Sequence, residues 1–476
     1  PILAGEPYQF PYLQSPSPDK IKQLVEDKSL STRVIILRHG QSSYNSQGRI
    51  QGRSDLSVLT AKGQQDAEMT GKAFQGLKFA AVYCSPLQRA QQTATTVLAC
   101  LAEKYPLRND DRLLEIDLPL WETLLNSEVR EKYGVEYQAW KQRPHELKML
   151  LPQPDGSMTE FFPVLALYEQ ARGFWQDILA QHQGETIAIV AHNGINRALI
   201  STALGIPAQK YHSVQQSNCG VSVLNFSGGW GESVQLESLN QTSHLGQNLP
   251  TFRPPNQGPR LLLIRHGETD WNRAGQFQGQ IDIPLNDHGR NQASLAAEFL
   301  KTVQIDFAFT STMQRPKETA EIILTAHPGV KLGEDADLRE ISHGLWEGKF
   351  EAEIEAEYPG KLEEWRTQPA SVQMPEGENL QAVWHRATAA WQKILHQVGT
   401  NPQTGIVVAH DATNKVLLCY LLGLDLADFW KIKQGNGAVT VIDYPEGIEG
   451  QPVIQALNLT SHLSGGILDR TAAGAL

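Results

Sequence analysis

Short apolar runs alternate with longer amphipathic stretches along the chain from residue 33 onward. The first run is Val34-Ile35-Ile36-Leu37, and such runs are typical of strands that are buried on both faces. In the longer stretches apolar residues recur three and four positions apart, which is typical of helices with one buried face. The pattern predicts strands over 33–38, 79–84, 186–191 and 219–226, and helices over 60–76, 86–102, 126–141, 164–182 and 193–204.

The same alternation restarts at residue 260, and it predicts strands over 260–265, 305–310, 404–409 and 437–443 with helices between them. Such alternation predicts an α/β fold with a largely parallel sheet between helical layers. We therefore expect two tandem three-layer α/β/α domains joined by a semi-rigid, proline-rich linker. The expected boundaries are an N-terminal arm at 1–32 with a short helix over 20–26, a first domain at 33–246, the linker at 247–258, a second domain at 259–464 and a C-terminal tail at 465–476.

Composition and charge narrow the class of protein. The 476 residues are 41% hydrophobic, enough for two cores, and no apolar run approaches the roughly 20 residues of a membrane-spanning helix. A net charge of −11 and a pI of about 5.7 argue against a nucleic-acid or anionic-membrane partner. We expect a soluble protein that binds a small molecule, with no nucleic acid and no membrane as partner.

The cysteines and the chain start bear on the compartment. Four cysteines lie far apart without a Cys-x-x-Cys pair, as expected for reduced thiols in a reducing compartment. No signal or transit peptide is visible, although the chain starts at Pro1 and an upstream segment could have been removed. The sequence does not specify an oligomeric state, but two domains of one fold can pair within a chain as a homodimer's subunits do.

One tripeptide occurs twice, as Arg38-His39-Gly40 and Arg265-His266-Gly267, each time at the end of a predicted buried strand. The residues downstream of the first copy also recur, roughly 220 positions later, which fits duplication of a whole domain. The carboxyl ends of parallel strands meet at one edge of a sheet, where ligands bind. Each copy therefore brings an Arg, His, Arg, His set to one crevice, namely Arg38, His39, Arg89 and His192, and Arg265, His266, Arg315 and His410.

This set suits a phosphate monoester. Two guanidiniums can hold the dianion while staying charged, and a neutral imidazole can attack phosphorus. The second imidazole, if protonated, can stabilise the oxygens during transfer. Glu115 and Glu340, which occupy matching places, are candidates to protonate the leaving group. No His/Asp cluster with metal-ligand spacing appears beyond these residues, so we expect neither a metal nor another cofactor. Ser85 and Ser311 are expected to begin helices whose N-termini add positive potential.

The motifs resemble the histidine phosphatase superfamily, the phosphoglycerate-mutase-like enzymes. The set comprises Arg265-His266-Gly267-Glu268-Thr269-Asp270-Trp271-Asn272, Ser311-x-x-x-Arg315, Leu338-Arg339-Glu340 with Gly344-Leu345-Trp346-Glu347-Gly348 after it, Pro375-Glu376-Gly377-Glu378 and Ala409-His410. The resemblance covers both copies and implies a phosphoglycerate-mutase-like fold. It also implies phosphohistidine nucleophiles at His39 and His266, phosphate ligands at Asn45 and Asn272, and acid/base residues at Glu115 and Glu340.

The tandem arrangement resembles a two-domain branch of this family from chloroplasts and cyanobacteria. That implies a phosphorylated sugar or sugar acid as substrate, and the chloroplast stroma or the cytoplasm as compartment. The first copy departs from the family pattern at Gln41, at Leu118-Pro-Leu-Trp-Glu-Thr123 and at Asp155-Gly-Ser-Met158, which affects its substrate pocket more than its phosphate chemistry. In the second copy, Pro316 stands after Arg315 where alanine is usual.

Three functional hypotheses are consistent with these residues. We favour a metal-independent phosphomonoesterase, because a mutase needs more enclosing sequence than the short interval between Ala320 and Glu340 offers. A phosphoglycerate mutase-type phosphotransferase is the alternative, and the third hypothesis is one active copy with a regulatory or binding pseudoenzyme copy. The repeated His244 and His462, at a strand exit, are interpreted as structural, and His343 as a loop residue close to the pocket.

Overall fold

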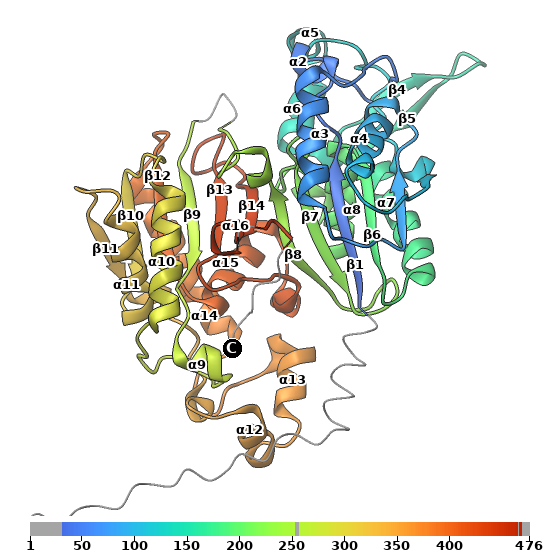
Figure 1. Cartoon of the computed structure of the whole chain (residues 1–476). Helices are drawn as coiled ribbons and strands as arrows, with labels where there is room; N and C mark the ends of the chain where they lie inside the picture. Colours follow the sequence, from blue (N-terminus) through green and yellow to red (C-terminus); the bar gives the residue numbers. More distant parts are fainter. Residues whose placement is uncertain (1–30, 253–256, 465, 469–476) are drawn as a thin grey trace, which may run out of the picture.

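A computed structural model describes residues 31–252, 257–464 and 466–468. The arm with its helix predicted over 20–26, part of the linker and most of the tail lie outside the described residues. In the described part a twelve-stranded sheet crosses the molecule, with strands in the order β11-β10-β12-β9-β13-β14-β8-β7-β1-β6-β2-β3 (Figure 1). The six strands at each end of this order belong to one copy of the repeat.

The first copy agrees closely with the predicted alternation. Its strands are β1 (Thr32–Arg38), β2 (Ala81–Cys84), β3 (Leu107–Asn109), β4 (Met149–Pro152), β5 (Met158–Phe161), β6 (Thr186–Ala191), β7 (Val221–Phe226) and β8 (Val234–Gln241). Its helices are α2 (Ser43–Gln47), α3 (Ala61–Ala73), α4 (Gln88–Ala99), α5 (Asn126–Lys132), α6 (Gly134–Gln142), α7 (Pro163–Gln181) and α8 (Asn193–Leu204).

The second copy repeats this order. Its strands are β9 (Arg260–Arg265), β10 (Phe307–Ser311), β11 (Leu332–Asp335), β12 (Thr404–Ala409), β13 (Val439–Asp443) and β14 (Val453–Leu459). Its helices are α9 (Asp270–Ala274), α10 (Asp287–Leu300), α11 (Gln314–Leu324), α12 (Glu351–Glu357), α13 (Lys361–Thr367), α14 (Leu380–Val398), α15 (Asp411–Leu422) and α16 (Ser461–Ser464). No helix of the described ranges is long and apolar enough to cross a membrane.

Each half of the sheet lies between two helical layers. In β1, Ile35 and Leu37 pack with residues of α3 and α4, while Val34 and Ile36 pack with residues of α7 and α8. Strand β1 pairs in parallel with β6 and antiparallel with β7, and all seven of its residues are buried. The predicted α/β class with largely parallel sheets is therefore confirmed, and the apolar runs result from burial on both faces.

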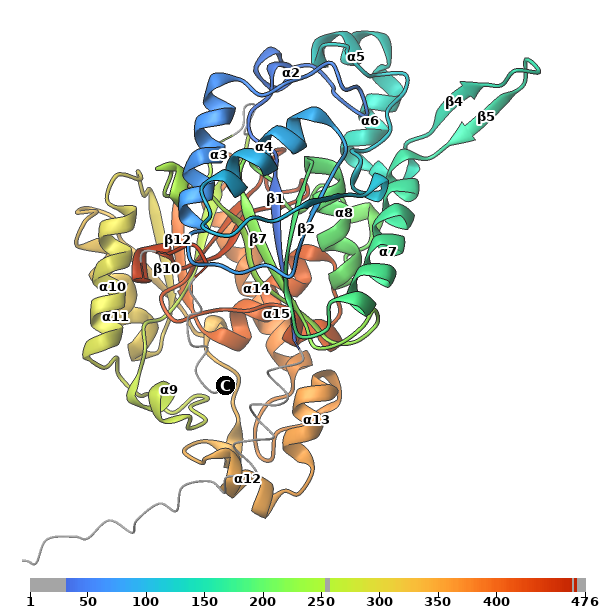
Figure 2. The same ribbon diagram turned by 45° about the vertical axis from the view of Figure 1, so that its right-hand side comes forward.

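The two halves join edge to edge. Strands β8 and β14 pair antiparallel, with Leu239 opposite Leu457, and one apolar cluster extends across this seam. Both figures show the two halves of the sheet side by side (Figure 2). Neither strand was among those predicted, and the pairing turns two half-sheets into one.

Two local predictions were wrong, and one hairpin was missed. The helix predicted over 126–141 is two helices, α5 and α6, because the backbone leaves the helical conformation at Tyr133. Helices α4 and α11 begin at Gln88 and Gln314, three residues after the serines expected to start them. The antiparallel hairpin of β4 and β5 was not predicted, and it projects from the first copy (Figure 2).

The glycine of each Arg-His-Gly tripeptide allows a close backbone approach. A Cβ added to Gly40 would lie 2.5 Å from the carbonyl oxygen of Gly63 in α3, and one added to Gly267 would lie 2.4 Å from that of Gly289 in α10. A side chain at either position would have to push the strand end and the helix apart. The tripeptide is thus a packing requirement as well as a chemical motif.

We expect Gly40→Ala to lower the free energy of unfolding by about 1–3 kcal/mol, because backbone cannot yield as a flexible side chain does. The measurement is the urea midpoint monitored by circular dichroism. Gly134→Ala, in the same copy, is the control, since an added Cβ meets nothing within 4 Å there. Equal stability of the two variants would contradict the close-packing interpretation.

Candidate active sites

The fold gathers the predicted residues into two equivalent clusters at the carboxyl ends of the parallel strands. We call them site 1 (Arg38, His39, Asn45, Arg89, Glu115 and His192) and site 2 (Arg265, His266, Asn272, Arg315, Glu340 and His410). In site 1 the rings of His39 and His192 lie 5.1 Å apart between centroids, edge to face. The equivalent rings in site 2, His266 and His410, lie 5.2 Å apart.

The first histidine of each site is held by its own loop. The Nδ1 atoms of His39 and His266 lie 2.7 Å from the carbonyls of Gly40 and Gly267. Since a carbonyl only accepts, Nδ1 carries the proton and Nε2 has a free lone pair. In site 2 this Nε2 accepts a hydrogen bond of 3.2 Å from Nε of Arg315. The geometry therefore fixes the tautomer that a nucleophilic imidazole requires.

The second histidine of each site is held by a serine at the end of a strand. Nε2 of His192 lies 2.7 Å from Oγ of Ser85, and Nε2 of His410 lies 2.9 Å from Oγ of Ser311. The sequence had suggested helix N-termini for these serines; the helices begin later, and the hydroxyls orient imidazoles instead. Their matching places in the repeat were the signal that could have indicated this role.

All four rings are buried, and their pKa values lie well below the ordinary 6.5. Burial is the largest cause, because it penalises the charged form. The two arginines of each site lower the pKa further by charge repulsion. The four imidazoles are therefore neutral near pH 7, as the nucleophilic role demands.

Backbone carbonyls hold the arginines. Arg89 donates to the carbonyls of Ser54 and Gly52, at 2.9 and 3.0 Å. Arg315 donates in the same way to those of Ile281 and Gly279, at 3.1 and 2.8 Å. Neutral acceptors fix each guanidinium without cancelling its charge, so the charge stays available to an anion.

The first arginine of each site contacts the loop that precedes strand β7 or β13. Nη1 of Arg38 donates to the carbonyl of Gln216 at 2.8 Å, and Nη1 of Arg265 donates to that of Gln434 at 2.7 Å. Arg265 also contacts Oδ1 of Asp411 at 3.2 Å. At the position equivalent to Asp411 the first copy has Asn193, so site 1 has one carboxylate fewer.

The predicted phosphate ligands Asn45 and Asn272 lie beside the first histidines. Their Oδ1 atoms accept hydrogen bonds from Asn218 and Asn436, at 3.2 and 3.3 Å. The amide nitrogen is then the group left to donate to an anion. Asn218 and Asn436, which also donate to the carbonyls of His39 and His266, were missed by sequence analysis. The Gln-x-Asn spacing common to both copies could have identified them.

The candidate acids lie at the N-terminus of the helix after the second histidine. Glu115 accepts from the backbone of Gly194 and Ile195, both at 3.1 Å. Glu340 accepts from that of Ala412 and Thr413, at 3.3 and 3.4 Å. Burial, and then the charge of nearby Asp411, raises the pKa of Glu340 above 4.5. A buried carboxyl of raised pKa is suited to donate a proton.

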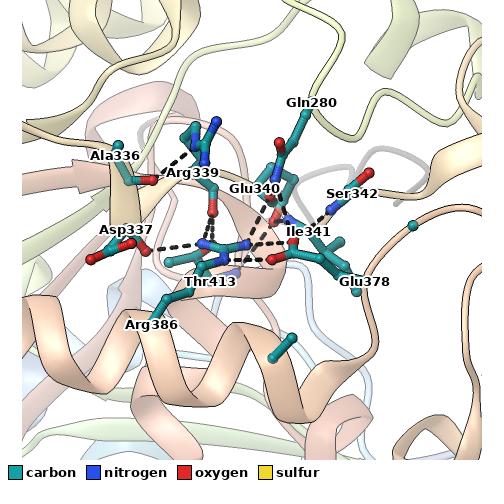
Figure 3. A network of polar contacts seen from close by, with 12 residues as sticks. Gln280, Ala336, Asp337, Arg339, Glu340, Ile341, Ser342, Glu378, Arg386 and Thr413 are labelled. Atoms are coloured by element: carbon teal, nitrogen blue, oxygen red, sulfur yellow. Dashed lines mark hydrogen bonds and ion pairs between the residues drawn. The ribbon is translucent and has the colours of Figure 1, made fainter.

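An arginine of α14 anchors the segment that carries Glu340 (Figure 3). Arg386 donates to the carbonyls of Asp337, Arg339 and Glu340, and its Nε lies 2.8 Å from Oε1 of Glu378. Glu378 in turn accepts from the backbone of Ser342 at 2.9 Å. Glu378 belongs to the Pro-Glu-Gly-Glu motif, whose position next to an arginine-bearing helix only the structure reveals.

The first copy holds the equivalent segment, which carries Glu115, but here the arginine comes from a different element. Gln170, equivalent to Arg386, donates to the carbonyls of Arg112 and Leu114, both at 2.9 Å. Arg53, equivalent to Gln280, donates to Glu115's carbonyl at 3.3 Å and to Oε1 of Gln170 at 2.9 Å. The arginine and the glutamine have exchanged places between the copies, while the carbonyls that they hold are equivalent.

Site 2 opens into a narrow pocket, and His343 lies at its wall as predicted. The lining residues are Arg265, His266, Asn272, Gln278, Gly279, Arg315, Glu340 and His343. Burial lowers the pKa of His343 to about 3, so its ring is uncharged near neutral pH. Among residues 31–252, 257–464 and 466–468, no three His, Cys, Asp or Glu side chains are grouped so as to hold a metal ion.

Comparisons with known proteins identify the family to which the chain belongs. The sequence model of the histidine phosphatase superfamily (branch 1) matches residues 34–240 and 261–460. The 2-carboxy-D-arabinitol-1-phosphatase of Triticum aestivum is 32% identical over 461 residues, which cover 94% of this chain and 89% of the wheat protein. Phosphoserine phosphatase 1 of Hydrogenobacter thermophilus is 33% identical over 43% of this chain and 94% of its own. Among solved structures, Bacillus stearothermophilus YhfR is 30% identical, with a TM-score of 0.41, over 43% of this chain and 99% of that chain.

We expect Arg386→Gln and Glu378→Gln each to lower the free energy of unfolding by about 2 kcal/mol, since each leaves a mostly buried charge without its counter-ion. The double variant should lose less than the sum, and a double-mutant cycle from urea unfolding measures the coupling. The exposed Arg366–Glu351 pair, treated identically, is the control and should couple far more weakly. Additive effects of the two main variants would contradict a single anchored network.

Proposed function

Because the chain belongs to the histidine phosphatase superfamily and is a phosphatase, we propose that it is a metal-independent phosphomonoesterase acting through phosphohistidine. The proposed substrate is a sugar phosphate or a phosphorylated sugar acid. The name of the wheat relative makes 2-carboxy-D-arabinitol 1-phosphate the first candidate. One observation carries the proposal: a neutral imidazole, with Nδ1 bonded to a carbonyl, directs its Nε2 toward a guanidinium.

The proposed first step transfers the phosphoryl group to the histidine. Nε2 of His39 or His266 attacks phosphorus, the bond from phosphorus to the ester oxygen breaks, and Glu115 or Glu340 protonates the departing alkoxide. In the second step water attacks the phosphohistidine and gives its proton to the same carboxylate. The nitrogen–phosphorus bond breaks, and inorganic phosphate and the neutral imidazole are released.

The arginines supply the charge neutralisation that this transfer requires. Two buried guanidiniums per site face the position of a dianion, where they are pre-oriented and poorly screened. A bound dianion would also offset the repulsion that lowers the pKa values of His192 and His410. Protonation of these rings thus accompanies substrate binding in the proposed mechanism.

Both copies retain the full set of reacting groups, so we assign competence to both sites with different preferences. Site 1 has Asn193 where site 2 has Asp411, and Arg53 where site 2 has Gln280. It therefore carries one carboxylate fewer and one guanidinium more at these two positions. A substrate with a second anionic group, such as a phosphorylated sugar acid, is favoured at site 1, and a more general phosphomonoester at site 2.

Loss of one nucleophile should affect one set of substrates most. We expect His39→Ala to lower hydrolysis of sugar-acid phosphates most strongly, and His266→Ala to lower that of other alkyl monoesters most strongly. Either single variant should still hydrolyse p-nitrophenyl phosphate, whose leaving group needs no proton. The double variant should lose at least about 10³-fold on every substrate. Rates over a panel of phosphate esters, together with rapid-quench trapping of acid-labile phosphate, measure this.

As a control, a metal chelator is added to these assays, and the activity should remain unchanged. If either single variant loses all hydrolysis while still folded, the other copy is a passenger or regulator. Phosphoryl transfer to a second sugar acid, in place of release to water, would favour the mutase alternative.

The pH dependence of site 2, isolated in a His39→Ala background, is set by its pKa shifts. Activity should persist well below pH 6.5, because His266 stays neutral there, and should fall as rising pH deprotonates Glu340. Glu340→Gln should remove this alkaline limb and lower kcat about 100-fold for an alkyl phosphate. The loss should be much smaller for p-nitrophenyl phosphate, whose leaving group needs no proton. Equal losses for the two substrates would exclude Glu340 as the proton donor.

A further inference from the structure

Asn240 and Asn458 occupy equivalent places in β8 and β14, the strands that join the two copies. Both have a positive φ, 54° and 55°, which asparagine adopts more readily than most residues. Each lies where the pairing with the neighbouring strand shifts register, that is, in a β-bulge. The preceding residues, Leu239 and Leu457, pair with each other across the seam, so the two bulges face one another.

Each of these side chains donates one hydrogen bond to the other copy and accepts one from its own. Asn240 also donates from Nδ2 to Oγ of Ser217 in its own copy, at 3.1 Å. Nδ2 of Asn240 donates to the carbonyl of Gln455 in the second copy, and its Oδ1 accepts from the backbone N–H of Ser217, both at 2.7 Å. Asn458 makes the reciprocal pair, to the carbonyl of Glu237 at 2.7 Å and from Gly435 at 2.8 Å. Both side chains are buried, so neither bond is replaced by bulk water when it is lost.

The bonds within each copy end on a loop that belongs to an active site. We call residues 215–220 and 433–438 the clamp loops. The loop in the first copy accepts the Arg38 guanidinium at Gln216 and donates from Asn218 to the carbonyl of His39. The backbone N–H of Cys219 also donates to the carbonyl of Arg38, at 3.1 Å.

The clamp loop of the second copy makes the same contacts. It accepts the Arg265 guanidinium at Gln434 and donates from Asn436 to the carbonyl of His266. The backbone N–H of Gly437 donates to the carbonyl of Arg265, at 3.1 Å. In both copies the clamp loop thus holds the first arginine and the backbone of the nucleophile.

We propose that Asn240 and Asn458 are reciprocal positioning residues. Each is hydrogen-bonded to the opposite copy and, through the clamp loop of its own copy, holds the phosphate-binding arginine of its own site in place. Docking of one copy is then a condition for full phosphate affinity of the other. This role concerns phosphate binding in the phosphatase. It rests on the proposed function in one respect, namely that both sites are active.

The test changes the donor group of one asparagine in the full-length chain. Asn240→Asp keeps the Oδ1 acceptor and tolerates positive φ, but it loses the Nδ2 donor to Gln455 and to Oγ of Ser217. Asn458→Asp loses only the donor to Glu237. With p-nitrophenyl phosphate as substrate and inorganic phosphate as competitive inhibitor, a His266→Ala background reports site 1 alone. There, KM and the phosphate inhibition constant should rise about tenfold, with a smaller change in kcat, because the Nδ1 anchor of His39 lies outside the clamp loop.

The reciprocal measurement separates positioning from a general loss of stability. In a His39→Ala background, which reports site 2, Asn240→Asp should leave the phosphate inhibition constant within about twofold. Asn458→Asp should show the opposite selectivity. The defect should also shrink as pH falls, because the introduced carboxyl group regains a donor when it is protonated.

Gln235→Ala is the matched control. Gln235 also donates across the seam, at 3.3 Å, but its acceptor is the carbonyl of Trp430, which lies outside the clamp loops. Phosphate affinity of both sites should therefore stay unchanged in this variant. If Asn240→Asp does not fold, Asn240→Gly removes all three side-chain bonds, keeps the backbone conformation and adds no charge.

Equal losses at both sites, or no loss at either in a folded variant, would overturn the proposal. If the His266→Ala or the His39→Ala background is inactive by itself, this result contradicts the proposed two-site function and leaves the role of the asparagines to be tested at the other site. The phosphate inhibition constant of the remaining active site still tests its own asparagine in that case.

Discussion

The structure depends on keeping an uncharged imidazole between two permanently charged guanidiniums. Burial and repulsion from the arginines lower the pKa of each first histidine, and a backbone carbonyl fixes the proton on Nδ1. Such an arrangement is electrostatically unfavourable without an anion, so each charged group needs a fixed, neutral support. Backbone carbonyls provide most of that support here, and the glycine contacts bring the strand end close enough to helix and loop to supply it.

The two copies support the candidate acid with different residues. A buried carbonyl requires a donor, but the element from which the donor comes is free to vary. In the second copy the donor is Arg386 on α14, paired with Glu378; in the first it is Gln170 on α7, aided by Arg53 from the loop after the nucleophile. The exchange moves a charge from a buried helix face toward the rim of the site and leaves the acid in place. Both copies can therefore hold the acid in the same place while the residues that line the two sites differ.

The seam gives the duplication a structural reason. An open sheet edge exposes unpaired backbone groups and invites association with other chains. Pairing β8 with β14 removes one such edge from each half-sheet. Because the bulged asparagines lie in these same strands, the interface that protects the edges also reaches the loops that hold the phosphate site.

The sequence by itself determined the duplication, the α/β class and the residues that the fold gathers into the two clusters, because local patterns in the chain specify them. Apolar runs mark strands buried on both faces, and Arg-His-Gly at the end of such a strand locates the reacting groups at the carboxyl edge of the sheet. The supporting contacts depend on which distant backbone carbonyls and N–H groups the fold brings together. The Ser85–His192 bond, the Arg386 anchor and the asparagine links across the seam join residues far apart in the chain, most of them through groups that every residue has, so no local pattern distinguishes them. Only the tertiary structure decided these contacts, since backbone partners carry no side-chain identity for a motif to record.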